Sequence, residues 1–364
     1  MRSAYLILLV ACAPPGPIAM RDRSDATGGW PEGVTLRVCA GGGGDFTDIQ
    51  PAVDASIPGD VIGVCPGTYG PVKITWGVDV DIIGLGGPNQ TFIEGAGRPA
   101  ELDEGTLDLR GFHLRGDGLY DPYFPKAGGF SLYEGTASLT NSIVEGATGP
   151  FTVLFDEDFF VMEDVVFRDN NTQFLWYLWQ GEDDEGLIGS ARITNNTVIG
   201  GTHETLIETD KVVDLVLANN VFAHVRIDTG FSAFVFRREG GGLLQVHNNM
   251  FYDIDDLAPT GGRLFEMNGN ADFRNNIVVG CDAYDLMPMD GSYSLFFDNG
   301  VDYAPMVNGE GNLFVDPMFT DPDRLDFSLR PGSPAIDAGD PETIYVDDDG
   351  TRNDMGANGG PIAM

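Results

Sequence analysis

The sequence predicts an all-β solenoid of stacked parallel strands, and two repeated patterns support this prediction. The first is an Asn-Asn pair followed by apolar residues, found in "TNNTVIG" (194–200), "ANNVFAH" (218–224), "VHNNMFYDI" (246–254) and "RNNIVVG" (274–280). The second is an apolar pair followed by a polar residue, as in "LIE" (206–208), "LFE" (264–266) and "FFD" (296–298). The uneven intervals are typical of coils that accept loop insertions, whereas helical repeats keep a stricter length.

Each repeat also carries a strand-like alternation of apolar residues just before the asparagines, as in "LLQVHNN" and "ADFRNN". Together the two patterns predict two strands in each coil. Asparagine tolerates the left-handed backbone of a sharp turn, and its side-chain amide can bond the backbone of the next coil. We therefore interpret the Asn-Asn pairs as an internal ladder of the scaffold and not as an active site.

The N-terminal part of the chain resembles a known family. "GGGDFTDIQPAVDASIPGDVIGVCPGTYGPVKI" (42–74) looks like the opening coil of right-handed parallel β-helix proteins of the pectin-lyase-like superfamily, and "DIIGLGGPNQTFIEG" (81–95) continues it. The resemblance implies a right-handed parallel β-helix with a short capping helix near 47–56. It implies no single activity, because one fold hosts many functions.

The C-terminal "NLFVDPMFTDPDRLDFSLRPGSPAIDAGDP" (312–341) and "DDDGTRNDMGANGGP" (347–361) resemble the closing segment of exported bacterial β-helix proteins. We therefore expect a leader at 1–12, a tether at 13–33, a β-helix at 34–330, and a C-terminal cap at 331–364. An open solenoid end exposes strand edges and core, so the cap is expected to cover the final coil.

The first residues, "MRSAYLILLVACAPPGP", indicate export. A single arginine precedes a short apolar stretch that is too short to span a bilayer. "LVAC" (9–12) resembles the bacterial lipobox, which would make Cys12 a lipidated residue in the cell envelope, for instance at the outer membrane. A plain secretory signal is the alternative interpretation.

Three further cysteines follow Cys12. Cys39 and Cys65 each follow a valine at the end of an apolar run, so they could lie on neighbouring turns and form a disulfide, which export permits. Cys281 is expected to be a buried thiol. No pair of cysteines has the spacing of a zinc site.

The charge balance limits the partners. The chain has 56 Asp and Glu residues against 20 Lys and Arg residues, for a formal net charge of −36. Such a field repels nucleic acid and anionic lipid. It also disfavours polyanionic glycans unless a cation or a local arginine patch bridges them. We expect a monomer that contacts a membrane only through a lipid anchor.

Two columns of side chains are the first candidates for a ligand groove. Aligned by the apolar pair that precedes them, seven polar residues should stack along the solenoid axis: Glu134, Asp156, Gln180, Glu208, Arg237, Glu266 and Asp298. They form either a solvated edge or a groove of carboxylates for calcium or acid/base work. The adjacent column is either an aromatic core stack or a platform for sugar rings: Tyr133, Phe155, Trp179, Ile207, Phe236, Phe265 and Phe297. In "FLWYLWQ" (174–180), Trp176 and Trp179 are candidates for substrate binding.

The same region holds candidates for catalysis. In lyases of this fold, which the resemblance implies, an arginine or lysine removes a proton from a uronate. Arg237 or Arg238 with Glu208 and Asp210 could do this, and Asp156 with Glu208 and Asp210 could serve a hydrolase. His203, Glu134 and Glu266 are further candidates for substrate binding. The complete motifs of polygalacturonases and pectate lyases are absent from the sequence.

A candidate calcium loop lies near the C-terminus. In "YVDDDGTRNDMGANGG" (345–360), Asp347, Asp349, Asn353 and Asp354 offer hard oxygen ligands around a glycine turn. A turn rich in Asp and Asn is the alternative. Three functions therefore remain open: an envelope protein that binds polysaccharide, a polysaccharide lyase or glycoside hydrolase, and a purely structural surface protein.

Overall fold

The structure is a computed structural model, and the part of the chain that it describes belongs almost entirely to one compact unit, residues 33–364. The described residues are 30–75, 77–95, 98–116, 130–133, 135–148, 151–155, 159–180, 189–210, 213–228, 232–236, 243–257, 263–267, 271–282, 289–302, 304–305 and 307–360. At 130–133, 151–155, 173–174, 179–180, 210, 213 and 289 only the backbone is described.

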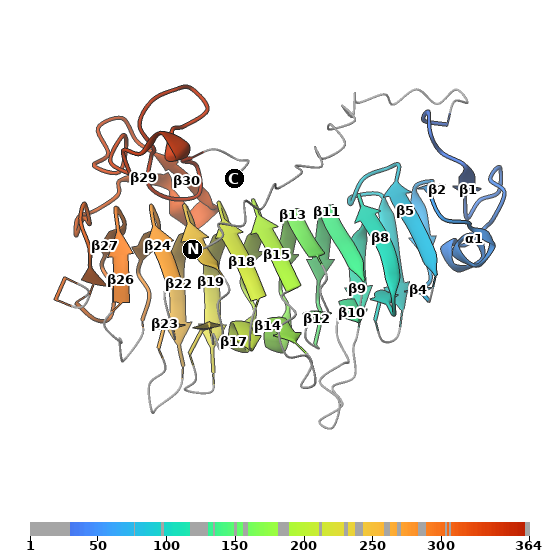
Figure 1. Cartoon of the computed structure of the whole chain (residues 1–364), viewed down its shortest axis with the longest axis horizontal. Coiled ribbons are helices and arrows are strands. Elements are labelled where there is room, and N and C mark those ends of the chain that lie inside the picture. The colour runs from blue at the N-terminus through green and yellow to red at the C-terminus, as the bar shows by residue number, and fades with distance from the viewer. Residues whose placement is uncertain are drawn as a thin grey trace, which may run out of the picture. The chain divides into compact units, whose positions relative to one another are not determined.

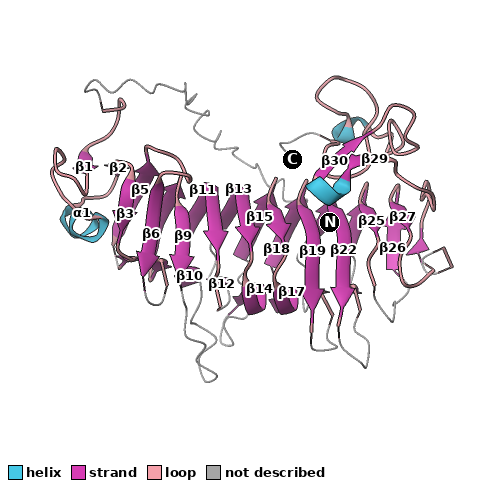
Figure 2. Cartoon of the chain, turned by 180° about the vertical axis from the view of Figure 1, so that it is seen from behind, coloured by secondary structure: helices cyan, strands magenta, loops and turns pink. Residues whose placement is uncertain are grey.

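The unit is a parallel β-helix whose coils stack three parallel sheets (Figure 1; Figure 2). The first sheet contains β1 (Leu36–Val38), β2 (Asp60–Val64), β5 (Val78–Gly84), β8 (Gly105–Arg110), the first halves of β11 (Thr136–Glu145) and β13 (Phe159–Arg168), β15 (Gly189–Thr194), β18 (Val213–Ala218), β21 (Leu244–His247), β24 (Ala271–Arg274), β26 (Met289–Ser292) and β28 (Val307–Asn308).

The second sheet contains β3 (Gly67–Tyr69), β6 (Thr91–Gly95), β9 (His113–Gly116), the second halves of β11 and β13, β16 (Thr197–Ile199), the first halves of β19 (Val221–Ile227) and β22 (Met250–Asp256), β25 (Ile277–Val279) and β27 (Leu295–Phe297). The second half of β19 pairs with the second half of β22 and with the beginning of β17 in the third sheet. The third sheet contains β4 (Val72–Ile74), β7 (Ala100–Leu102), β10 (Phe130–Tyr133), β12 (Phe151–Phe155), β14 (Asn171–Gln180), β17 (Thr202–Asp210), β20 (Phe234–Phe236) and β23 (Phe265–Met267).

The presence of three sheets corrects the prediction of two strands in each coil. The apolar alternation before the asparagines lies in the first sheet, as in β21 and β24, whereas the apolar pairs of "LIE" and "LFE" lie in the third sheet, on β17 and at the start of β23. The second sheet was not predicted separately, because β16, β25 and β27 have only three residues each and cannot show an alternation of period two.

The asparagine pairs have the structural role that the sequence predicts. The first residue of each pair is left-handed, with φ of 59° at Asn195, 57° at Asn219 and 53° at Asn248. The second residue of each pair is fully buried and joins its coil to the next: Asn220 donates from Nδ2 to Asn249 Oδ1 at 3.0 Å, and its backbone N–H donates to the same oxygen at 3.0 Å. The ladder consists of Asn196, Asn220, Asn249 and Asn276, and Ser294 and Asn312 extend it.

The N-terminal end of the β-helix is closed by helix α1 (Ile49–Ala55), near the predicted 47–56 (Figure 1). Asp48 caps the helix by accepting a hydrogen bond from the Ile49 N–H at 2.8 Å. Ile49, Ala52 and Val53 turn towards the core and are buried. Beside this cap, Cys39 and Cys65 form a disulfide between consecutive coils, with their Cα atoms 5.0 Å apart.

The C-terminal segment, residues 319–360, packs against the side of the β-helix (Figure 1; Figure 2). The sequence predicted instead that it covers the final coil. It contains β29 (Phe319–Asp321), β30 (Asp326–Leu329) and the short 3₁₀ helices η1 (Pro322–Arg324) and η2 (Thr343–Tyr345). Phe319, Phe327 and Met355 cover apolar residues that face outward from the second sheet, among them Met250 and Ile277. The last strand of the parallel sheets ends at Asn308, and an isolated parallel bridge follows at Leu313. Both lie before residue 330, the predicted end of the β-helix.

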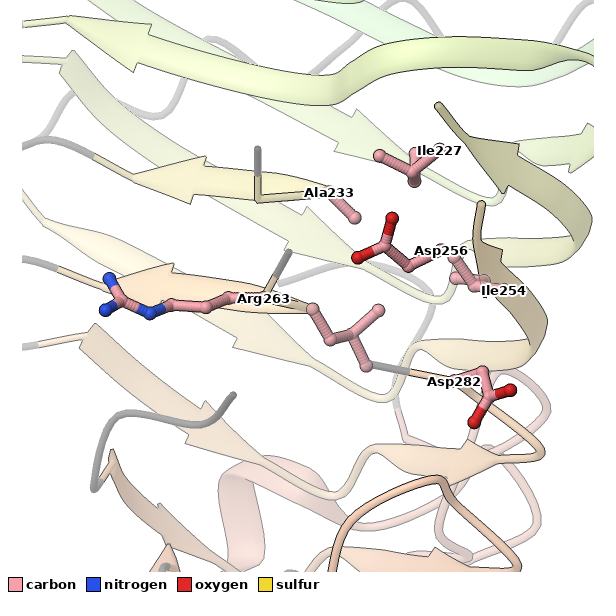
Figure 3. Close-up of a pocket in the computed structure, with 7 residues that line it drawn as sticks. Ile227, Ala233, Ile254, Asp256, Arg263 and Asp282 are labelled. Carbon is pink, nitrogen blue, oxygen red and sulfur yellow. The ribbon is translucent and has the colours of Figure 1, made fainter. Parts of the chain in front are cut away.

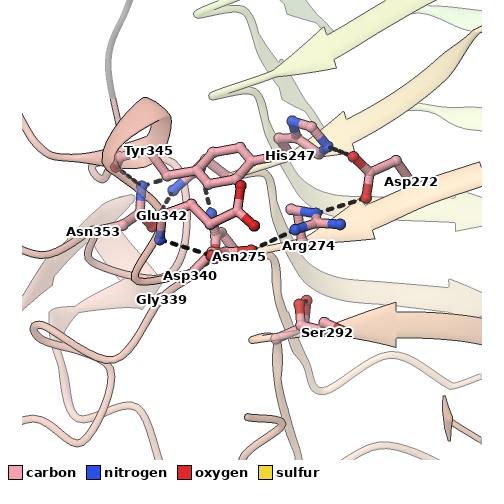
Figure 4. A network of polar contacts seen from close by, with 12 residues as sticks. His247, Asp272, Arg274, Asn275, Ser292, Gly339, Asp340, Glu342, Tyr345 and Asn353 are labelled. Atoms are coloured by element: carbon pink, nitrogen blue, oxygen red, sulfur yellow. Dashed lines mark hydrogen bonds and ion pairs between the residues drawn. The ribbon is translucent and has the colours of Figure 1, made fainter. Parts of the chain in front are cut away.

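Polar contacts hold this segment in register (Figure 4). Arg274 donates to Asp272 Oδ1 at 2.6 Å and to the buried Asp340, and its guanidinium lies 5.4 Å from the ring centre of Tyr345. The outward asparagines contribute as well: Asn219 Nδ2 donates to the Gly359 carbonyl at 2.7 Å. Asn219, Asn248 and Asn275, each the first asparagine of its pair, therefore make a turn and also bind the C-terminal segment.

We predict that replacing a ladder asparagine is severely destabilising. Asn249→Ala leaves the Asn220 N–H and the carbonyls of Leu217 and His247 without their partner. Each buried polar group left unpaired costs about 1–3 kcal/mol, so the free energy of unfolding should fall by roughly 2–4 kcal/mol. Denaturant unfolding measures this value.

The matched control is Asn358→Ala, because Asn358 is exposed and makes one long contact, at 3.4 Å, to the Phe327 carbonyl. Its cost should stay below about 0.5 kcal/mol. Equal losses in the two variants would contradict the ladder's role.

Candidate functional site

The outward face of the second sheet changes character along the solenoid. One register position, here called the outer row, is occupied in successive coils by Glu94, Arg115, Glu145, Arg168, Ile199, Ala223, Tyr252, Val279 and Phe297. Its first four members alternate in charge, and we call them the charged row. The apolar members from Ala223 onward pack against the C-terminal segment. The C-terminal segment packs on this face through an apolar cluster, and the charged row lies outside that cluster.

Ion pairs join each member of the charged row to the next. Arg115 Nη1 lies 2.8 Å from Glu94 Oε1, and Arg115 Nη2 lies 3.0 Å from Glu145 Oε2. Arg168 Nε donates to Glu145 Oε1 at 2.7 Å. The Arg115 guanidinium also lies over the Phe92 ring, 5.0 Å from its centre. Both arginines are thus held in one orientation by their acidic neighbours.

His113 is buried beneath the charged row and contacts Glu145. It is 2% exposed, and its Nε2 lies 2.9 Å from Glu145 Oε2. Burial lowers the pKa of His113, and the positive charge of Arg115 lowers it further. Burial by itself would raise the pKa of Glu145, but the hydrogen bonds from Arg168 and Arg115 outweigh it and lower the pKa. The neutral imidazole and the ionised carboxylate are therefore the stable forms near neutral pH.

An open hollow of about 470 Å³ lies beside the charged row. It is lined by Glu94, Gly95, Arg115, Gly116, Glu145 and Gly146, two residues from each of three successive coils. Gly95 is required by packing, since a Cβ there would come within 2.6 Å of Pro71 Cγ, and Gly146 is left-handed with φ of 69°. The volume lies in the range of small-molecule sites, so the hollow has room for sugar rings.

The chemistry of the hollow favours binding over catalysis. A general acid or base needs a pKa close to the working pH. Glu145 has a lowered pKa, and Arg115 has a raised one, because its bonds to Glu94 and Glu145 outweigh the opposing effect of burial. His113 is buried behind them. The charged row therefore offers fixed donors and acceptors and not a proton to transfer.

Two of the predicted substrate-binding residues are buried. Trp176 has no exposed surface and packs edge-on against Phe167 and Phe222 in the core. His203 is 1% exposed and shares a 2.8 Å hydrogen bond between its Nδ1 and Thr172 Oγ1. The prediction that they contact a ligand is wrong, because a shift of one residue along a strand moves a side chain from the outer face to the core.

The predicted polar column does not exist as one stack. Glu208 pairs in register with Tyr177 and with Val235, which in turn pairs with Glu266, so one coil separates the two glutamates. Gln180 pairs instead with Phe155, and Asp298 follows β27 in the second sheet. An apolar pair followed by a polar residue occurs in different sheets, so aligning by that pattern cannot fix the register. Ile207, Phe236 and Phe265 of the neighbouring column are core residues, at most 3% exposed.

The other predicted site residues remain untested. Glu134, Asp156, Arg237 and Arg238 lie outside the described residues, and the side chains of Trp179 and Asp210 are not described. The backbone register places Trp179 beside Asp210 on adjacent coils. Glu266 is half-buried and accepts a hydrogen bond from Ser232 at 3.1 Å. Catalysis by the third sheet therefore stays a prediction.

The predicted calcium loop is partly used for other contacts. Asn353 has no exposed surface, its Oδ1 accepts from Asn248 at 3.0 Å, and its Nδ2 donates to the Tyr345 carbonyl at 2.7 Å. Asp349 accepts from the Thr351 hydroxyl at 2.6 Å. In the described part of the chain, no three acidic, histidine or cysteine side chains gather closely enough to share a metal ion. Asp347, Asp349 and Asp354 do not form such a group in this structure, so calcium binding here stays a prediction.

A second cavity is too small for a ligand (Figure 3). Ile227, Ala233, Ile254, Asp256, Arg263, Leu264 and Asp282 surround about 10 Å³. That volume is at the lower limit for one water molecule.

The remaining expectations concern cysteines and membranes. Cys281 is a buried free thiol, as expected. Cys12 and the rest of the leader and tether up to residue 29 lie outside the described residues. Within the described ranges, the helices are too short and too polar to cross a bilayer.

The charged row was not predicted, although the sequence contains a signal for it. A second left-handed position follows the first asparagine by a constant interval: Asn195 and Gly200, Asn219 and His224, Asn248 and Asp253. The residue just before this second position belongs to the outer row. Alignment on the Gly, Asp or His of the second turn would have placed Glu145 beside Arg168.

No family model matches the chain, and no curated protein matches it. Among solved structures, it is similar to a pectin methylesterase from Aspergillus niger, at 13% identity and a TM-score of 0.36 over 67% of this chain and 92% of that one. It is also similar to the pectin methylesterase from carrot, at 12% identity and a TM-score of 0.35 over 83% of this chain and 93% of that one.

We predict that His203 makes the protein less stable in mild acid. Burial lowers the pKa of His203 from 6.5 to about 4. Between these values the unfolded chain takes up a proton that the folded chain refuses, so stability falls as pH falls from 6.5 to about 4. The full effect is about 3 kcal/mol.

The measurement is the free energy of unfolding of the protein and of His203→Gln at pH 7 and pH 4. The variant lacks this titration, so it should lose less stability than the parent over the same interval. Identical losses would show that His203 titrates normally in the folded state.

Proposed function

We propose that this chain is an exported β-helix protein that binds a neutral carbohydrate polymer at the charged row. The observation that carries the proposal is the open hollow whose lining residues come in pairs from three successive coils. A repeated set of donors and acceptors suits a ligand that itself repeats.

The arginines of the row are ready to bind without rearrangement. Arg168 is 40% exposed, and its Nε is bonded to Glu145. Within the described residues, no partner is present for its terminal nitrogens, which supports a role in donating to ligand oxygens. Because Glu145 already fixes the side chain, binding would cost little conformational entropy.

Charge supports a neutral ligand. The chain carries −36 overall, which repels polyanions, while the four members of the charged row are balanced by opposite signs. Hydroxyl groups both donate and accept, so they can bond guanidinium and carboxylate groups in alternation. Neutral glycans therefore fit the row better than acidic ones.

Export supports a ligand outside the cytoplasm. The Cys39–Cys65 disulfide is typical of proteins that fold in an oxidising compartment. Lipidation of Cys12 would hold the protein in the cell envelope, close to surface or environmental polysaccharide.

We expect Arg168→Gln to weaken retention on neutral polysaccharides by about tenfold or more, since a charged hydrogen bond contributes about 1.5–3 kcal/mol. Affinity electrophoresis on a panel of neutral and acidic polysaccharides measures retention. Arg324→Gln is the control, because Arg324 is 85% exposed on η1. Equal retention of both variants would contradict binding at the charged row.

The same panel separates binding from catalysis. Digests assayed for new reducing ends and for unsaturated uronates should show neither. Product release that survives Arg168→Gln would instead direct attention to the third sheet.

We expect Cys12→Ser to release the protein from the membrane fraction after expression in a bacterium with a lipoprotein pathway. The parent should label with a palmitate analogue, and the variant should not. Unchanged fractionation without label in the parent would support the plain secretory signal.

A further inference from the structure

We propose that the glycan lies along the solenoid axis and that the charged row accepts a segment of about four sugars. This inference rests on the proposed function and specifies the length and direction of its ligand.

The spacing of the row sets the scale. Glu94, Arg115, Glu145 and Arg168 are register partners in consecutive coils. Neighbouring strands lie about 4.8 Å apart, so Glu94 and Arg168 are separated by roughly 14 Å along the axis. A sugar unit in an extended glycan spans a distance similar to one strand spacing. One sugar can therefore lie beside each member of the row.

The shape of the hollow supports the axial direction. Its lining pairs, Glu94 with Gly95, Arg115 with Gly116 and Glu145 with Gly146, are displaced from one another along the axis. The three glycines present no side chain beyond Cα. The hollow is consequently continuous from coil to coil along the C-terminal ends of β6, β9 and β11, where the glycines lie.

The N-terminal end of the row is closed. Tyr69 pairs with Ile93, so the next residue, Gly70, precedes Glu94 in the row. Gly70 has no side chain to offer, and its N–H lies 3.4 Å from Asp48, the capping residue of α1. The charged row therefore has no continuation towards the N-terminus.

The C-terminal end of the row is closed in a different way. Ile199 follows Arg168 in register and replaces the charge by an apolar side chain. One coil further, Ala223 has no exposed surface and packs in the apolar cluster that contains Phe319 and Phe327 of the C-terminal segment. A longer glycan would have no polar partner beyond Arg168 in this row.

The test is a length series of neutral oligosaccharides, from the monosaccharide to the octasaccharide, measured by calorimetry. Cello- and manno-oligosaccharides serve as the probes, together with oligomers of the neutral polymer that is retained most strongly. Each added unit should raise affinity by about threefold or more up to the tetrasaccharide, and later units should add little.

The other outcomes are distinct. Affinity that rises steadily to the octasaccharide, or that is already complete with the monosaccharide, would overturn the inference while leaving glycan binding intact. Absence of binding at every length, with no polymer retained, would overturn the proposed function itself.

A variant tests the boundary directly. Ile199→Gln adds a polar group at the next position of the row, so the plateau should move from the tetrasaccharide to the pentasaccharide. Val216→Gln, a comparable change at a half-buried position of β18 in the first sheet, is the control and should leave the plateau unchanged. If both variants keep the plateau of the parent, Ile199 does not end the site.

Discussion

The buried asparagine ladder is the interaction on which the rest of the structure depends. The amides of Asn220 and Asn249 each accept from the preceding coil and donate to the next, which fixes the register in which these coils stack. The left-handed residue before each of them begins the second sheet, and a second left-handed residue ends it after a constant interval. Between these two turns no insertion is tolerated. Side chains of the second sheet therefore align coil after coil, whereas the loops around the third sheet vary freely.

This fixed register is what allows one sheet face to have two uses. Towards the C-terminus, apolar members of the outer row pack under Phe319 and Phe327, and Asn219, Asn248 and Asn275 bond the backbone of the C-terminal segment. Towards the N-terminus, the same row consists of ion pairs and stands beside an open hollow. The C-terminal segment thus stabilises the β-helix from its side and also limits the length of the exposed polar face.

The sequence predicted the scaffold better than the site. The ladder and the Cys39–Cys65 pairing follow from local signals, a turn that needs Asn and two strand ends that meet. The capping helix follows from the resemblance of residues 42–74 to the opening coil of parallel β-helix proteins. The site depended on register between coils, which an apolar pair cannot define because it recurs in different sheets. Trp176 and His203 were misplaced because a shift of one residue along a strand moves a side chain from the outer face to the core. Arg115 was overlooked because it belongs to no repeated motif. The position of the C-terminal segment depended on contacts with residues about a hundred positions away, such as Asn248 with Asn353.

The central claim is that the ligand surface is the N-terminal part of the outer face of the second sheet, where the charged row lies. Hydrogen–deuterium exchange with and without a retained neutral polysaccharide tests it most directly, because exchange reports on each segment separately. The account predicts slower exchange in peptides covering 91–116 and 143–169 on binding, with no change in 221–227 and 250–297. Protection confined to 171–180 and 205–236 would move the site to the third sheet and contradict the claim.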